Sequence, residues 1–134
     1  MADVKISKKQ LDEAVNKKIL SLLGLSVRAG KLVTGTDKIC DEIRRHGMPS
    51  EDGKGYSTCG IAVIASDASA NTKKRIMNAC NYYRVECVSV KLTQSQIADI
   101  TGKAAVASCA TFDRGFADGI RRALELYHLS NTDK

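Results

Sequence analysis

The segment KLVTGTDK, residues 31–38, joins a short expected strand to a glycine and the start of an expected helix. A helix N-terminus presents free backbone N–H groups and a partial positive charge, which both favour a phosphate or an electron-rich base edge. Gly35 lets another molecule approach the backbone closely, because it has no side chain. Lys31, Lys38 and the upstream Arg28 add positive charge, so the segment fits a site for phosphate or nucleic acid.

The same segment also fits a simple helix cap. Thr34 and Asp37 have the spacing of a common capping pattern, in which Asp37 would serve its own helix. The sequence contains no GxxxxGK[ST] motif, so a Walker phosphate loop is excluded. The pattern alone gives the cap and the binding site about equal weight.

A second segment, SDASANTKKR at residues 66–75, again brings cations to the expected start of a helix. Asn71 can donate to or accept from a base edge or a phosphate, and Lys73 and Lys74 supply charge. The alternative is that Ser69 caps the helix and that the cations face solvent. These two interpretations also have equal weight.

A third segment, TGKAAVAS at residues 101–108, places a glycine, a lysine and small apolar residues between a helix and a strand. Such a loop can admit a nucleotide closely, with Val106 as an apolar contact. A tight turn whose small residues serve packing is the preferred interpretation without further context.

Catalysis finds little support in the sequence. Asp67 could act as a base, but neither His46 nor His128 has a convincing partner, and GxSxG, HExxH and GxGxxG motifs are all missing. The cysteines form no CxxC pair, which argues against a metal site and favours a reducing compartment. Those expected to be buried and unbridged, because they fall in apolar segments, are Cys40, Cys80, Cys87 and Cys109.

The length of 134 residues predicts one domain, and a hydrophobic fraction of 43% is enough for a core. The net charge of +6 suggests a polyanionic partner, and solubility alone is the less favoured explanation. The N-terminal residues lack the apolar core of a signal peptide, and no apolar run is long enough to cross a membrane. We therefore expect a cytoplasmic protein.

Hydrophobic periodicity predicts alternating helices and strands, which favours a central sheet with helices on both faces. The expected elements are helix 19–30, strand 31–34, helix 36–46, strand 60–66, helix 67–83, strand 85–90, helix 93–102, strand 104–110 and helix 112–124. The residues expected to face inward from the third and last helices are Ile76, Met77, Cys80, Phe112, Phe116, Ile120 and Leu124. The expected organisation is a flexible N-terminal extension at 1–16, one domain at 17–127 with an inserted loop at 48–59, and a tail at 128–134.

Three phrases carry a resemblance to a known family: LLGLSVRAGKLVTG, VIASDASANTKKRI and TGKAAVASCATFDRGFADGI. They resemble the L-seven-Ae superfamily of kink-turn RNA-binding ribosomal proteins, and its small bacterial members of the YlxQ type in particular. The resemblance extends over roughly residues 17–125 in the same order. It implies a three-layer α/β/α sandwich with a four-stranded mixed sheet, and binding to RNA kink-turns, which are sharp bends beside tandem sheared G·A pairs.

In such relatives a Gly-x-Asn-Glu helix opening reads the guanines of the G·A pairs, and this motif falls on Gly35-Thr36-Asp37-Lys38. The loop that meets the extruded nucleotide falls on Lys103-Ala104-Ala105-Val106. This chain departs from the motif, because Asp37 has lost the amide donor and Lys38 cannot accept a hydrogen bond. Selective readout of G·A pairs is therefore in doubt, whereas electrostatic binding of RNA is not.

We therefore expect a non-catalytic RNA-binding protein, monomeric, without a cofactor or metal, that binds ribosomal or kink-turn RNA as part of a ribonucleoprotein. The alternative is a protein-interaction module of the same fold associated with ribosomes or translation, and an enzyme that uses Asp67 as a base is the weakest alternative. RNA binding would weaken steeply with salt, which separates it from protein binding. The expected RNA-binding residues are Arg28, Lys31, Gly35, Thr36, Asp37, Lys38, Lys73, Lys74, Lys103, Ala104, Ala105 and Val106.

Overall fold

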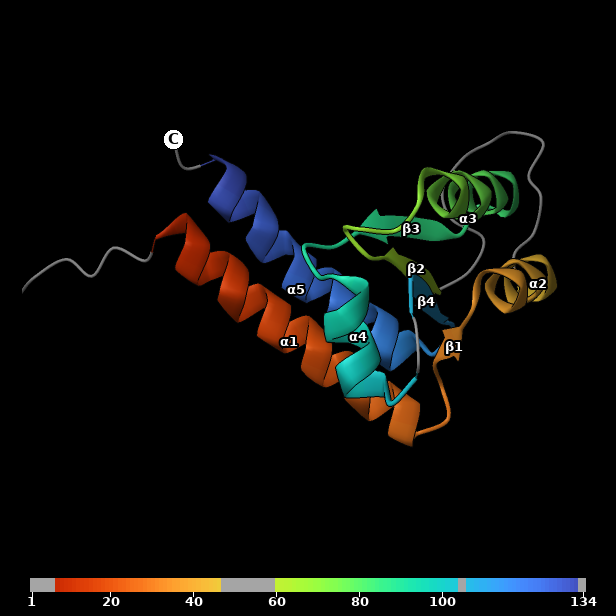
Figure 1. The fold of residues 1–134 in the computed structure, drawn as a ribbon, viewed down its shortest axis with the longest axis horizontal. Coiled ribbons are helices and arrows are strands. Elements are labelled where there is room, and N and C mark those ends of the chain that lie inside the picture. The colour runs from red at the N-terminus through yellow and green to blue at the C-terminus, as the bar shows by residue number, and fades with distance from the viewer. Residues whose placement is uncertain (1–6, 47–59, 104–105, 133–134) are drawn as a thin grey trace, which may run out of the picture.

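A computed structural model describes residues 7–46, 60–103 and 106–132 of the chain (Figure 1). Helices and strands alternate along these residues, as expected from the hydrophobic pattern. The elements are, in chain order, α1 (Lys8–Arg28), β1 (Val33–Thr34), α2 (Thr36–His46), β2 (Ile61–Ile64), α3 (Ala70–Tyr83), β3 (Glu86–Ser89), α4 (Gln94–Thr101), β4 (Ser108–Thr111) and α5 (Arg114–Thr132). In this part of the chain no helix is long and apolar enough to cross a bilayer. The expected loop at 48–59 lies outside the described residues.

The strands form one mixed sheet in the order β1-β4-β2-β3. The last strand in the sequence, β4, lies between β1 and β2 and is antiparallel to both, whereas β2 and β3 are parallel. Every residue of β2 and β4 is buried, since these central strands are covered on both faces. The expected four-stranded mixed sheet is confirmed.

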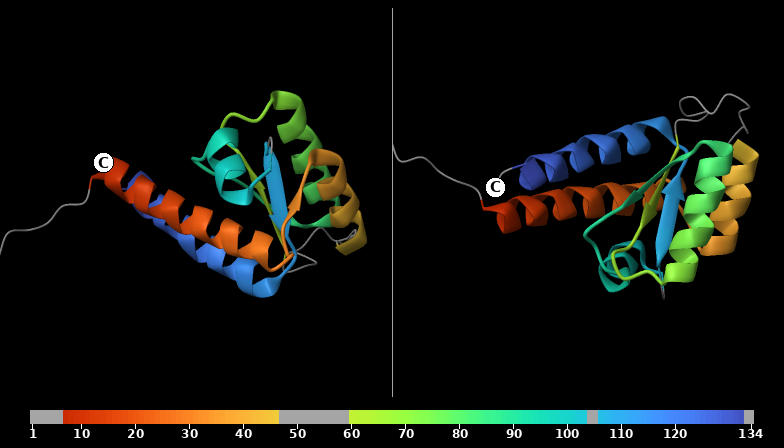
Figure 2. Two further views of the ribbon diagram at one scale, coloured as in Figure 1. Left: turned by 60° about the horizontal axis from the view of Figure 1, so that its bottom comes forward. Right: turned by 90° about the horizontal axis from the view of Figure 1, so that it is seen from above.

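Helices cover both faces of the sheet, which gives three layers (Figure 2). On one face α1, α4 and α5 pack through residues such as Ile19, Ile97 and Ile120. On the other face α2 and α3 pack through residues such as Ile39 and Ile76. The α/β/α sandwich is therefore confirmed, and each face has its own hydrophobic core.

The first helix begins earlier than the apolar periodicity suggested. Ser7 and Gln10 form a capping box at its start, in which Gln10 donates its N–H to Ser7 Oγ at 3.1 Å. Val15 is fully buried in the core. The expected boundary at residue 16 therefore falls inside α1. The N-terminal half of α1 and the C-terminal part of α5 run side by side beyond the sheet (Figures 1 and 2).

Local sequence signals mark the end of α1 and both ends of α4. Gly30 follows α1 with a φ of 70°, and its N–H donates to the carbonyl of Val27 at 3.0 Å. The N–H of Lys31 donates to the carbonyl of Ser26 at 2.8 Å, which completes a Schellman motif. Thr93 and Gln96 form a capping box at the start of α4, and Gly102 follows its end in the left-handed conformation.

One residue expected to face inward is exposed, and another packs inward but lies outside the helix to which it was assigned. Met77 on α3 is 48% exposed, because Ile76 and Cys80 occupy the buried stripe and Met77 lies beside it. Phe112 precedes α5 instead of belonging to it, since β4 ends at Thr111 and α5 begins only at Arg114. Its ring packs against the core on the α2 and α3 side of the sheet.

The four cysteines expected in the core are free thiols, and three of them are buried: Cys40, Cys80 and Cys109. Cys87, on β3 at the edge of the sheet, is only half-buried. Burial raises the pKa of the Cys109 thiol to about 12. Cys59 lies outside the described residues.

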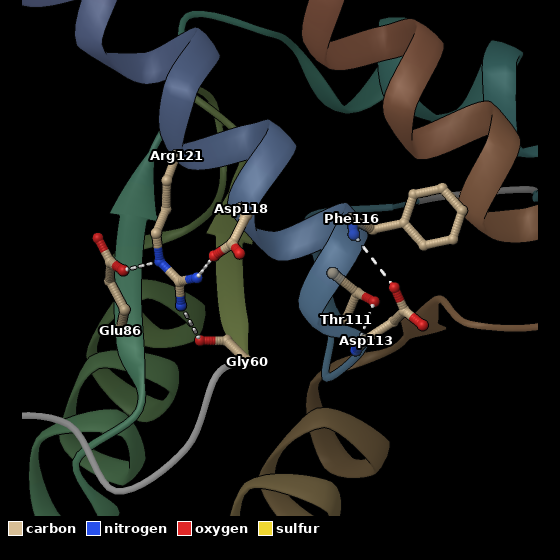
Figure 3. Close-up of polar contacts among 7 residues, drawn as sticks. All are labelled: Gly60, Glu86, Thr111, Asp113, Phe116, Asp118 and Arg121. Carbon is tan, nitrogen blue, oxygen red and sulfur yellow. Dashed lines mark hydrogen bonds and ion pairs between the residues drawn. The ribbon is translucent and has the colours of Figure 1, made fainter.

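Arg121 on α5 connects this helix to the edge of the sheet. Its Nε donates to Oε1 of Glu86 on β3 at 2.5 Å, and its Nη1 donates to Oδ1 of Asp118 at 2.8 Å. Its Nη2 donates to the carbonyl of Gly60, just before β2, at 2.9 Å. Figure 3 shows the guanidinium directed at all three acceptors, so one side chain joins a helix to two neighbouring strands.

We predict that Arg121→Ala lowers the free energy of unfolding by about 1–3 kcal/mol, because it leaves the half-buried Glu86 carboxylate and the Gly60 carbonyl without this donor. Arg122→Ala, on the exposed side of the same helix, is the matched control and should have little effect. Urea unfolding followed by circular dichroism measures both variants. Equal losses for the two variants would show that the Arg121 network does not contribute to stability.

Candidate nucleic-acid interface

The turn between β1 and α2 sets the position of the first candidate site. Gly35 has a φ of 97°, a conformation that side chains disfavour, and its carbonyl accepts from the N–H of Ile39 at 2.9 Å as α2 begins. Since Gly35 stands at the capping position and has no side chain, it cannot cap the helix. Asp37 and Lys38 in the first turn are both exposed.

Asp37 does not act as the cap that its spacing from Thr34 suggested. Its Oδ1 accepts from Nη2 of Arg75 at 2.7 Å, and this ion pair joins the first turn of α2 to α3. The hydrogen bond with Asp37, together with its negative charge, raises the pKa of the Arg75 guanidinium. Arg75 was not among the expected site residues, and no local pattern could reveal a contact with a residue 38 positions away.

The start of α3 follows the capping interpretation. Ser69 Oγ accepts from the N–H of Thr72 at 3.1 Å, so this residue caps its own helix. Lys73 reaches back over the end of β2, where its Nζ donates to the carbonyl of Ser66 at 3.4 Å. Lys74 is exposed. The helix cap and the cations therefore occur together, so a capping role for Ser69 does not exclude a binding role for the lysines.

The beginning of β4 lies at the same end of the sheet. The N–H of Ala65, just after β2, donates to the carbonyl of Ala107 at 2.9 Å. Thr34 pairs with Cys109, so Gly35 comes one step further along β1 in the direction of Ala107. Figure 2 shows the N-terminal ends of α2 and α3 at the same end of the sheet as the start of β4.

The loop before β4 differs from its expected role in one respect. Val106 is 1% exposed and belongs to the core on the α1, α4 and α5 face, so its side chain is not available as a surface contact for a nucleotide. Lys103 is exposed. Ala104 and Ala105 lie outside the described residues, and their part in the site stays a prediction.

Two expected cations do not join this end of the sheet. Arg28 lies at the end of α1, where its Nε donates to the carbonyl of Gly24 at 3.4 Å on the side of α4. Lys31 precedes β1, and extension of the β1–β4 register places it opposite Phe112, at the far end of the strand from Gly35. The structure therefore separates these two residues from the cluster around Lys38.

Asp67 has a structural partner. Its Oδ1 accepts from the N–H of Gln94 at 2.8 Å, and its carbonyl accepts from the Gln94 side chain at 3.0 Å. The carboxylate thus connects the loop after β2 to the start of α4. This contact accounts for Asp67 without a catalytic role.

The described residues at this end of the sheet carry an excess of positive charge. The N-termini of α2 and α3 add partial positive charge at the same end of the sheet. Asp37 is offset by its partner Arg75. The remaining cations are Lys38, Lys73, Lys74 and Lys103. The arrangement can hold phosphates and offer donors to base edges.

No protein-family model matches the chain. The chain is 32% identical over 115 residues to the RNA-binding protein YlxQ of Enterococcus faecium, an alignment that covers 86% of this chain and 99% of that protein. It is 33% identical over 104 residues to the RNA-binding protein YlxQ of Bacillus subtilis (strain 168), which covers 78% of this chain and 92% of that protein.

Two solved structures share the fold. A protein of unknown function from Bacillus halodurans aligns with a TM-score of 0.64 and 25% identity, over 83% of this chain and 97% of that one. The 15.5kD RNA binding protein of Giardia lamblia aligns with a TM-score of 0.60 over 87% of this chain and 90% of that one. At 10% identity the second likeness concerns the fold alone.

We predict that Gly35→Ala lowers the free energy of unfolding by about 1–2 kcal/mol, because a Cβ strains the backbone at a φ of 97° although no atom would clash with it. Gly115→Ala in the first turn of α5, where the φ is not positive, is the matched control; its Cβ would lie 3.3 Å from Asp113 Oδ1, and it should change stability less than Gly35→Ala. Urea unfolding measures both. A neutral Gly35→Ala variant would show that the turn relaxes to another conformation.

Proposed function

The chain belongs to the YlxQ-type branch of the L-seven-Ae superfamily, and from this membership we propose that it binds structured RNA. The site we propose is the end of the sheet where α2 and α3 begin. Its main residues are Gly35, Lys38 and Arg75, with Lys73 and Lys74 as flanking phosphate contacts.

The observation that best supports this proposal is the ion pair between Asp37 and Arg75. It joins two helix starts into one surface, so that the N–H groups of α2 and the cations of α3 face a ligand together. A phosphate backbone that runs across both helix starts would meet Lys38 first and Lys74 further on. One surface of this kind suits a folded RNA better than a single small anion.

We propose kink-turn or related RNA as the target, because the glycine-led opening of α2 is where relatives of the superfamily read sheared G·A pairs. In this chain the carboxylate of Asp37 is held by Arg75. Guanine offers the acceptors O6 and N7, for which a guanidinium is the commonest partner. Arg75, oriented by Asp37, is thus the residue that we propose for contact with guanine.

We propose that the protein acts in the cytoplasm as a non-catalytic, monomeric component of ribonucleoproteins, with ribosomal RNA among the candidate targets. A protein-interaction module is the second candidate, since Met77 and Tyr82 on α3 are 48% and 65% exposed and could be covered by a partner protein.

The test is a titration of the protein with a kink-turn RNA and with a straight duplex of matched length, repeated over a range of salt concentrations. We expect tighter binding to the kink-turn and a steep loss of affinity for both RNAs as salt rises. Equal affinity for the two RNAs would retire the kink-turn proposal. Absence of binding to either RNA would favour the protein-interaction module.

We predict that Lys38→Glu weakens RNA binding roughly ten-fold or more, because it removes a donor and adds a charge that repels phosphate. Lys9→Glu makes the same change of charge at the exposed start of α1, away from the proposed site, and is the matched control. Both variants are compared in the kink-turn titration at one salt concentration. If the two variants lose the same affinity, only the net charge of the protein matters and the proposed site is wrong.

We predict that Arg75→Ala reduces the preference for kink-turn over straight RNA by roughly ten-fold, because it removes the donor proposed for guanine. Its neighbour Lys74 is the control, since Lys74→Ala removes a phosphate contact and should weaken binding to both RNAs by the same factor. The ratio of the two dissociation constants is the quantity measured. An unchanged ratio for Arg75→Ala would exclude a base contact by this residue.

A further inference from the structure

A groove of about 600 Å³ lies at the other end of β1 and β4, away from the proposed RNA site. Its walls come from the segment between α1 and β1, from β1 itself, from the C-terminal part of α2 and from the turn between β4 and α5. We propose that this groove binds a single-stranded nucleotide that flanks the structured RNA, an inference that rests on the proposed function. The residues that would hold it are His46, Phe112, Lys31 and Arg114.

The groove contains a pair of stacked rings. The rings of His46 and Phe112 lie with centroids 4.5 Å apart and planes 16° from parallel. The His46 side chain is 45% exposed, so part of the ring remains accessible to a further planar group. Bases of single-stranded RNA stack on aromatic and histidine rings in this way, and the contact tolerates any base because every base has a π-face.

The His46 ring is held in place by a neighbour on its own helix. His46 Nε2 lies 3.1 Å from Oε2 of Glu42, one turn earlier on α2. The sequence alone shows no partner for this histidine, but the structure gives it both a carboxylate and an aromatic ring. A platform that is already ordered loses little entropy when a base stacks on it.

Two cations border the ring pair. Lys31 lies opposite Phe112 in the extended β1–β4 register, and Arg114 is the first residue of α5. Both side chains line the groove and both residues are exposed. A base on the His46 ring would therefore have its phosphates within the field of two positive charges, and the Arg114 guanidinium can bind a phosphate through two parallel N–H···O bonds.

The two carboxylates that line the groove are both engaged. Glu42 lies within 3.6 Å of Arg45 Nη1 as well as next to His46. Asp113 caps α5, since its Oδ1 accepts from the N–H of Phe116 at 3.1 Å and its own N–H donates to Oγ1 of Thr111 at 3.2 Å (Figure 3). Each of the two carboxylates therefore already has a partner within the protein, which offsets part of its charge in the groove.

The spacing of the two sites fits one continuous strand of RNA. Lys31 and Gly35 stand at opposite ends of β1, which corresponds to about 13 Å of extended backbone. A short unpaired tail that leaves a structured RNA at Gly35 can therefore reach the groove along α2. The groove would add affinity for the tail without taking part in recognition of the structured part.

The experiment compares a kink-turn RNA without a tail and the same RNA with a short single-stranded adenosine tail, on the 5′ or the 3′ side. We expect one of the tails to tighten binding by roughly ten-fold. His46→Ala and Arg114→Ala should each remove most of this gain and leave the affinity for the tail-less RNA unchanged. His46→Phe should keep the gain, because it retains a ring at the surface.

Arg44→Ala is the matched control, since Arg44 is an exposed cation on α2 that does not line the groove. It should leave the gain from the tail intact. If neither tail adds affinity, or if the gain survives both His46→Ala and Arg114→Ala, the groove inference is wrong while the proposed RNA site still stands. If the tail-less kink-turn RNA does not bind, the proposed function fails and the groove inference falls with it.

Discussion

The hydrogen bonding of β4 on both of its sides is the constraint on which the rest of the structure depends. Ser108–Thr111 pairs antiparallel with β1 and with β2, so the last strand of the chain lies in the middle of the sheet. Extension of the β1–β4 register places the turn at Gly35 opposite Ser108, at one end of this strand, and Lys31 opposite Phe112, at the other. Both candidate surfaces are therefore defined by the register of a single short strand.

The two faces of the sheet differ in the size of their hydrophobic cores and in what their helices present to solvent. The α1, α4 and α5 face holds most of the large buried side chains, and α5 is tied to the sheet edge by Arg121. The α2 and α3 face has a smaller hydrophobic core. It presents two helix starts at the same end of the sheet, and the Asp37–Arg75 ion pair links them. Because a rigid core supports α2 and α3, their N-termini can be aimed at a ligand without a change of fold.

Local sequence signals predicted many of the elements, whereas contacts between distant residues could not be predicted. The bounds of α2 were predicted correctly, because Gly35 and the apolar spacing of Ile39 and Ile43 are encoded within a few residues. The early start of α1 also had a local signal, the Ser7–Gln10 capping pattern, which the weaker apolar periodicity of that segment concealed. In contrast, the Asp37–Arg75 pair, the burial of Val106 and the stacking of His46 on Phe112 depend on the strand order, which no sequence window contains.

The central claim, that RNA lies across the starts of α2 and α3, is tested most directly by mapping backbone amide chemical shifts while a kink-turn RNA is added. The account predicts that the largest changes fall on Gly35–Lys38 and Lys73–Arg75, with little change in the part of α1 and α5 that runs beyond the sheet. Changes concentrated along that α1–α5 pair, with the helix starts unaffected, would contradict it.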